Sequence, residues 1–188
     1  MKNIENTNLY SVRLYDKNDY VEDFDQINFE LTKILMTHEN GNFGIEESQA
    51  ELQRLTDDIF YCEDVDTKIY VLYHNLDERP ISFALLTHDE TRYDWHMELI
   101  CTDANYCGLG YGTELFNAVA KDISKTKSKT LSSIIERENE ASIAIHEGFA
   151  KKNNVENHVL WLDNDRLLYE YNLREFNKEK NNNFDNNL

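Results

Sequence analysis

Several short segments alternate hydrophobic and polar residues, as strands with one buried face do. The segments with this pattern, or with a short apolar run rich in β-branched and aromatic residues, are 9–15, 68–74, 81–87, 95–102, 131–135, 159–162 and 167–173. Polar turns separate them, and the chain's one proline, Pro80, precedes a strand start, where it is tolerated. The pattern predicts about seven strands.

Elsewhere apolar residues recur every three or four positions, which predicts four helices. The first has Val21, Phe24, Ile27, Leu31, Ile34 and Leu35 at this spacing, and the second follows a capping box of Ser48 and Glu51. The third covers residues 115–123, and the fourth runs from Asn139 to about Phe149. The expected order is β-α-α-β-β-β-α-β-α-β-β. This is a mixed α/β (α+β) fold with a mostly antiparallel central sheet, which disfavours a doubly wound dinucleotide fold.

The length of 188 residues suits a single domain, which we expect over residues 1–176, with a polar disordered tail at 177–188. No apolar run approaches the roughly 18 residues of a membrane span. The N-terminal residues lack the apolar region of a signal peptide. Three cysteines without paired metal-ligand spacing indicate a reduced, cytoplasmic chain and no metal site.

The net charge is −17, and residues 1–66 hold 16 acidic against 5 basic side chains. Such a field repels nucleic acid and attracts cations. Direct nucleic-acid binding is therefore not expected. Solubility alone is the other interpretation of this charge, and the sequence leaves it open.

Three of the six glycines, Gly108, Gly110 and Gly112, fall within five residues, between a predicted strand and a predicted helix. Free backbone N–H groups and the positive end of the dipole make a helix N-terminus a phosphate site. The spacing is neither the G-x-G-x-x-G dinucleotide motif nor a P-loop. A phosphate-binding loop is the prediction, and a simple glycine-rich turn is the alternative.

The segment Cys107-Gly108-Leu109-Gly110-Tyr111-Gly112 resembles the Gln/Arg-x-x-Gly-x-Gly/Ala signature of the GNAT superfamily of N-acetyltransferases. A second family segment places an Asn seven residues before a Tyr or His, as in Asn139 and His146. The resemblance covers roughly residues 9–173. Cys107 departs from the family's Arg or Gln, and Gly148-Phe149 stands two residues before the position of the family's Gly-Phe.

The resemblance implies that acetyl-CoA binds across a splay between the fourth and fifth predicted strands. Backbone N–H groups from Gly108 to Thr113 would meet its pyrophosphate, and residues 100–102 would pair with its pantetheine. The cofactor-binding residues expected on this basis are Ile100, Cys101, Thr102, Cys107, Gly108, Leu109, Gly110, Tyr111, Gly112, Thr113, Asn139 and Ser142.

Acetyl transfer to an amine needs a base for the amine and a proton donor for the departing thiolate. The resemblance implies His146 as the donor, with a core histidine as the alternative. His96 and Glu98 share one face of the predicted strand, and either can serve as base. We prefer Glu98, although a solvated polar face explains both residues as well. Cys101 and Cys107 are expected to be packed thiols rather than nucleophiles.

We therefore expect an acetyl-CoA-dependent N-acetyltransferase that acts on a primary amine by direct attack. The acidic first third of the chain favours a cationic acceptor, either a polyamine- or aminoglycoside-like small molecule or a basic peptide. The alternatives are a catalytically degenerate acyl-CoA-binding domain and a tRNA-acetylating toxin, which the negative charge disfavours. Many members of the family form homodimers, so the resemblance also allows a dimer.

Overall fold

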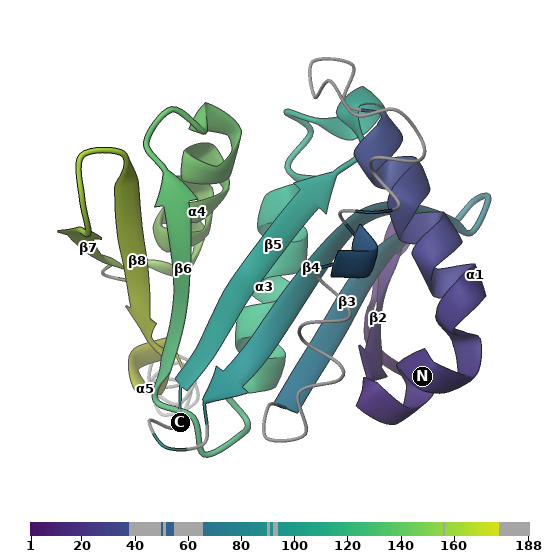
Figure 1. The fold of residues 1–188 in the computed structure, drawn as a ribbon, viewed down its shortest axis with the longest axis horizontal. Coiled ribbons are helices and arrows are strands. Elements are labelled where there is room, and N and C mark those ends of the chain that lie inside the picture. The colour runs from purple at the N-terminus through teal and green to yellow at the C-terminus, as the bar shows by residue number, and fades with distance from the viewer. Residues whose placement is uncertain are drawn as a thin grey trace, which may run out of the picture.

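A computed structural model describes residues 1–37, 50, 52–54, 66–89, 91, 94–155 and 157–176. Its centre is an eight-stranded sheet in the order β1-β2-β3-β4-β5-β6-β8-β7 (Figure 1). The strands are β1 (Lys2–Asn6), β2 (Tyr10–Asp16), β3 (Asp66–His74), β4 (Arg79–Asp89), β5 (Asp94–Thr102), β6 (Thr130–Glu136), β7 (Asn157–Trp161) and β8 (Arg166–Asn172). All neighbouring strands are antiparallel except β5 and β6, which are parallel.

Helix α1 (Lys17–Met36) lies on one face of the sheet, and α3 (Tyr111–Ile123) and α4 (Glu140–Asn153) lie on the other (Figure 1). A short 3₁₀ helix (Ala104–Tyr106) precedes α3, and the one-turn α5 (Leu173–Phe176) follows β8. No helix among these described elements is long and apolar enough to cross a membrane.

The predicted mixed α/β class and mostly antiparallel sheet are confirmed. The sheet has one strand more than predicted, since the edge strand β1 is mostly exposed and shows no apolar alternation. The second predicted helix falls largely outside the described residues, although 50 and 52–54 are helical. The predicted tail at 177–188 also lies outside them.

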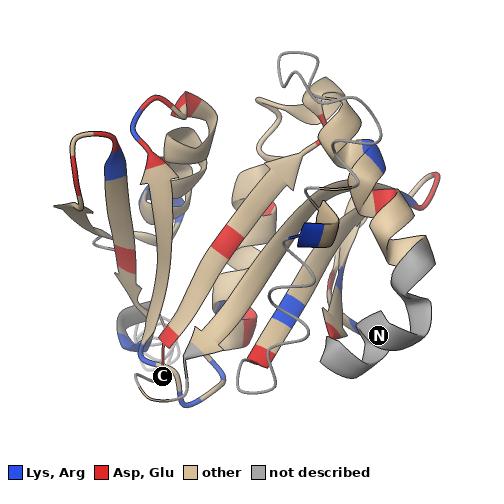
Figure 2. Cartoon of the chain, in the orientation of Figure 1, with Lys and Arg blue, Asp and Glu red and all other residues tan. Residues whose placement is uncertain are grey.

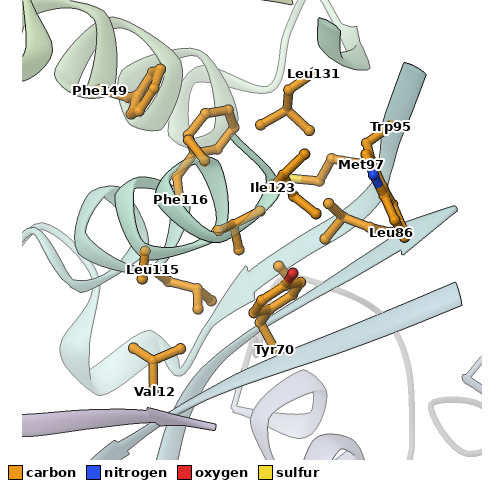
Figure 3. Packing of buried hydrophobic residues seen from close by; sticks show 14 of the residues in the cluster. Val12, Tyr70, Leu86, Trp95, Met97, Leu115, Phe116, Ile123, Leu131 and Phe149 are labelled. Carbon is orange, nitrogen blue, oxygen red and sulfur yellow. The ribbon is translucent and has the colours of Figure 1, made fainter. Parts of the chain in front are cut away.

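Two hydrophobic clusters hold the layers together. The cluster beneath α1 includes Ile27, Leu31, Ile69, Val71 and Phe83. The cluster beneath α3 and α4 is larger, and Figure 3 labels Val12, Tyr70, Leu86, Trp95, Met97, Leu115, Phe116, Ile123, Leu131 and Phe149 within it. The sheet is therefore buried on both faces where helices cover it.

A β-bulge in β5 changes which face its side chains take. Leu85 of β4 pairs with Leu99, whereas the next residue, Leu86, pairs with Met97, so Glu98 is the extra residue. Before the bulge, Met97 packs in the cluster under α3. After it, Leu99 and Cys101 pack on the cluster under α1. Simple alternation would have put Leu99 and Cys101 on the same face as Met97, so the bulge moves these two side chains to the α1 face.

The parallel strands β5 and β6 pair only at their beginnings, where Asp94–Met97 lies against Thr130–Ser133. Beyond this point β6 continues to pair with β8, and β5 with β4. Figure 1 shows the two strands diverging toward their carboxyl ends. The segment after β5 leads into α3 and the segment after β6 leads into α4, so these two segments lie on opposite sides of the opening.

Candidate functional site

A cavity of about 680 Å³ lies where β5 and β6 diverge. It is lined by Leu35, Leu99, Ile100, Cys101, Thr102, Tyr106, Cys107, Gly108, Gly110, Tyr111, Gly112, Thr113, Asn139, Ala141, Ser142, Ala144 and Ile145. The structure thus brings together the residues expected to bind the cofactor, except Leu109, whose side chain is 67% exposed. None of the described residues that line this cavity carries a charge.

The glycine loop presents bare backbone to this cavity. Gly108 and Gly110 have positive φ angles of 77° and 89°, a region that favours glycine. Gly110 is the N-cap of α3 and forms no side-chain cap hydrogen bond. The first N–H groups of α3 therefore have no partner from the cap side chain, which suits them to bind a phosphate.

Gly112 is needed for close packing between elements, not for an unusual backbone conformation. A Cβ at this position would lie 2.8 Å from Cδ1 of Ile145 and 3.1 Å from Oγ1 of Thr102. Gly148 is similar, since its Cβ would lie 2.9 Å from Oγ1 of Thr113. These two glycines let α3 and α4 approach closely, and the approach forms the end of the cavity next to the loop.

Asn139 begins α4, and its side chain accepts a hydrogen bond from the backbone N–H of Ser142 at 3.0 Å. Both residues line the cavity, on the wall opposite β5. The helix continues past Gly148-Phe149 and ends at Asn153. The family's closing Gly-Phe pair therefore does not mark the helix end here, and the gapless spacing from Asn139 to His146 holds.

The two described cysteines are poor nucleophiles. Burial raises the pKa of the Cys101 thiol to about 12, so the thiol stays protonated at neutral pH. The pKa of Cys107 is also raised, by partial burial and the nearby Asp103, and its Sγ donates to the carbonyl of Thr102 at 3.5 Å. Both thiols line the cavity as neutral groups, which favours direct transfer over a covalent enzyme intermediate.

His146 lies inside the core and does not line the cavity. Its Nε2 is 3.0 Å from Oγ of Ser133, and its Nδ1 is 2.9 Å from the hydroxyl of Tyr171. Phe116 and Tyr169 pack against the ring. Burial lowers the pKa of His146 to about 3, so the ring is neutral in the folded protein. This placement differs from the cavity position expected for a proton donor and gives His146 a structural role.

The neutral His146 predicts a pH-dependent stability. Because its pKa is lower in the folded than in the unfolded chain, the unfolded chain binds the extra proton, and stability falls as pH drops below about 6.5. Between about pH 6 and 4 this residue alone contributes a slope of about 1.4 kcal/mol per pH unit. We expect His146→Gln to be less stable at pH 7 and to flatten the slope, as measured by urea unfolding. Equal slopes for both proteins would contradict a buried neutral histidine.

His96 and Glu98 lie on the α1 face of β5, at the bulge. Thr87 of β4 donates its hydroxyl to Oε1 of Glu98 at 2.7 Å, and Nε2 of His96 is 4.0 Å from Oε2 of Glu98. Nδ1 of His96 is 3.0 Å from Oγ of Ser132 on β6. Both side chains are about one-third exposed. They do not line the cavity themselves, but Leu99, the next residue after Glu98, does.

Six cavity residues were not predicted: Leu35, Leu99, Tyr106, Ala141, Ala144 and Ile145. Tyr106 directly precedes the glycine loop, and the small Ala141 and Ala144 flank Ser142 on α4. Their positions next to predicted site residues could therefore have indicated them. Leu35 comes from the last turn of α1, far away in sequence. Only the packing of α1 over the end of β5 brings it to the cavity.

The model of the acetyltransferase (GNAT) family matches residues 31–150. A comparison with curated protein sequences gives no match. Solved structures similar to the chain include a chimeric spermidine N-acetyltransferase from Vibrio cholerae and hSSAT, with TM-score 0.59 and 15% identity over 89% of this chain and 97% of that one. The PaiA N-acetyltransferase from Thermoplasma acidophilum, solved with coenzyme A, has TM-score 0.59 and 12% identity over 87% and 98%.

An N-acetyltransferase from Staphylococcus aureus Mu50 is also similar, with TM-score 0.54 and 20% identity over 87% of this chain and 98% of that one. At these identities the structures establish the shared fold, and the family model covers more than half of the chain. The chain therefore belongs to the GNAT family of acetyltransferases, acyltransferases that take the acetyl group from acetyl-CoA.

Proposed function

We propose that this protein acetylates a primary amine on a cationic acceptor, either a polyamine- or aminoglycoside-like small molecule or a basic peptide. The position of Glu98 carries the proposal. Strand alternation puts this carboxylate on the same face as His96, the α1 face, and Leu99, the next residue, lines the cavity in which acetyl-CoA would lie. A carboxylate at this point can attract a protonated amine and then accept its proton.

Two features of the cavity fit acetyl-CoA. The N–H groups at the start of α3 would hold its pyrophosphate, and the part of β5 that β6 leaves unpaired would hold its pantetheine. The thioester supplies an activated acetyl carbon and a good leaving group. Without a cation in the described lining, binding would rest on backbone donors and on apolar contact with the pantetheine.

The reaction would begin with the loss of a proton from the acceptor's ammonium group to Glu98. The amine lone pair then adds to the thioester carbonyl carbon. The C–S bond breaks as the amide C–N bond is completed, the nitrogen loses its second proton, and this loss balances the proton that the departing sulfur takes up. His96 would orient Glu98 and is itself held by Ser132.

The charges around Glu98 support a cationic acceptor. His96 pairs in register with Ser132 on β6, and Ser132 pairs with Glu170 on β8, so a second carboxylate lies on the same face. Figure 2 shows the acidic positions within β5 and β8. The whole chain has a net charge of −17, which adds a long-range attraction for cations. One similar structure is named as a spermidine N-acetyltransferase and another as a ribosomal-protein acetyltransferase.

A thiol-release assay with acetyl-CoA and a matched panel of amines tests this proposal. We expect at least a tenfold higher kcat/KM for polyamines, aminoglycosides and Lys-rich peptides than for neutral or acidic amino acids. The KM for the cationic amine should rise with ionic strength, because salt screens the attraction. Preferred turnover of neutral amines would refute the cationic acceptor. Coenzyme A binding by calorimetry with no thiol release across the panel would favour a binding domain without catalysis.

A further inference from the structure

The turn between β5 and the glycine loop is built around a buried carboxylate, Asp103. This residue is 1% exposed and is the N-cap of the 3₁₀ helix Ala104–Tyr106. Its Oδ1 accepts hydrogen bonds from the backbone N–H and the side-chain Nδ2 of Asn105, both at 2.9 Å. Its carbonyl accepts a hydrogen bond from the N–H of Tyr106 at 2.8 Å. Asp103 therefore holds the short helix that leads into the loop at Gly108.

Arg79, the first residue of β4, supplies the opposite charge. Its Nη2 donates to Oδ2 of Asp103 at 2.5 Å. The N–H of Asp103 also donates to the carbonyl of Ile81 on β4 at 2.8 Å, which keeps the start of β4 alongside the end of β5. The Arg79 guanidinium lies 5.8 Å from the ring centroid of Tyr106, a residue that lines the cavity. Without Arg79, Asp103 would be a buried charge with no opposite charge beside it.

The charge of Asp103 reaches the cavity. Cys101 and Cys107, which stand shortly before and after it in the chain, both line the cavity. Burial is the largest cause of the raised pKa of each thiol, and the charge of Asp103 is a further cause for both. A carboxylate that acts on Cys107 also acts on an anion bound at the next residues, since partly buried charges are screened less than exposed ones. Unpaired, Asp103 would repel a pyrophosphate held at the start of α3.

We propose that Arg79 is a positioning residue for acetyl-CoA, which acts by neutralising Asp103 so that this carboxylate can shape the glycine loop without repelling the cofactor's phosphates. The inference rests on the proposed placement of the pyrophosphate at the start of α3. The two residues have separate tasks: Asp103 accepts the hydrogen bonds that hold the turn, and Arg79 offsets its charge. The pairing matters in a chain with a net charge of −17, because the described lining of the cavity contains no cation that could do the same.

Calorimetric titration with coenzyme A tests the charge role through a double-mutant cycle. We expect Arg79→Gln to weaken binding about tenfold, because the charge of Asp103 is no longer offset. Asp103→Asn removes this charge, and its amide oxygen can still accept hydrogen bonds from Asn105. The double variant Arg79→Gln/Asp103→Asn should therefore bind within about threefold of the wild type, as should Arg79→Lys. A double variant as weak as Arg79→Gln would overturn the proposal.

The matched control is Arg166→Gln, which breaks another Arg–Asp pair, with Asp163, in the turn between β7 and β8. Neither residue of this pair lines the cavity, so coenzyme A affinity should not change. In steady-state kinetics Arg79→Gln should raise the KM for acetyl-CoA about tenfold and leave kcat within about twofold, because it alters binding and not the reacting groups. A loss confined to kcat would contradict this role.

The pKa of the Cys107 thiol provides a measurement that needs no cofactor. Cys107 is exposed, and the pH dependence of its alkylation can be followed by mass spectrometry of its peptide. Arg79→Gln should raise this pKa by about half a pH unit, and Asp103→Asn should lower it by about as much. If Arg79→Gln does not fold, Asp103→Asn still decides. An unchanged Cys107 pKa in Asp103→Asn would overturn the proposal.

The variant Gly110→Asp separates this inference from the proposed placement of the cofactor. Loss of coenzyme A binding in Gly110→Asp, with normal binding in Arg79→Gln, would keep the pyrophosphate at the loop and overturn the role of Arg79. Normal binding in both variants would overturn the placement and the inference together. Weakened binding in both, with recovery in the Arg79→Gln/Asp103→Asn variant, is the result we expect.

Discussion

Replacing Gly110 with Asp is expected to abolish coenzyme A binding and to reduce kcat/KM for acetyl-CoA at least a hundredfold. The residue is the N-cap of α3 and borders the cavity. A carboxylate here would stand where the pyrophosphate is expected and would repel it. The positive φ of 89° adds a strain of about 1 kcal/mol for any residue with a Cβ.

Two further variants separate charge from strain. Gly110→Ala introduces a Cβ that meets nothing within 4 Å, so it should lower stability but keep most of the binding. Leu109→Asp adds the same charge at the neighbouring exposed residue, outside the cavity lining, and should bind coenzyme A within a few-fold of the wild type. Calorimetric titration measures the coenzyme A affinity of all three variants. Unchanged binding by a folded Gly110→Asp would place the cofactor elsewhere.

Replacing Glu98 with Gln is expected to lower kcat by 10²- to 10⁴-fold, the usual contribution of a general base. The amide keeps the shape of the side chain and can still bind Thr87, but it neither attracts nor deprotonates an ammonium group. Coenzyme A affinity should not change, because Glu98 does not line the cavity. Steady-state kinetics with a cationic amine, together with calorimetry, separate the two effects.

The matched control is Glu136→Gln, which removes one carboxylate from the far end of β6. It should change kcat by less than threefold. A Glu98→Gln variant with nearly full kcat would transfer the base role to another group, and His96→Gln would then be the decisive variant, because His96 is the other candidate at the bulge.

The elements and the glycine loop could be predicted because their signals are local. Helical spacing and strand alternation identified α1, α3, α4 and seven of the eight strands. Gly108 and Gly110 have positive φ angles, a backbone conformation that glycine adopts more readily than other residues. Strand β1 gave no such signal, since an edge strand that is mostly exposed needs no apolar face.

The role of each candidate residue was less predictable. The resemblance assigned Asn139, Ser142 and His146 to the site, and the first two do line the cavity. His146 stands a turn further along, where α4 packs over Ser133 and Tyr171, and it is buried there. Helical periodicity gives the relative direction of side chains, but it does not show where along the helix a cavity ends and the core begins.

The sequence by itself determined the fold class, the order of elements and the identity of the loop that opens α3, because each depends on contacts between near neighbours in the chain. Only the tertiary structure decided two further points. These are the bulge that turns Leu99 and Cys101 toward the α1 face, and the burial of His146. Each depends on which strand or helix lies alongside, and neighbours distant in sequence leave no periodic trace in a single chain.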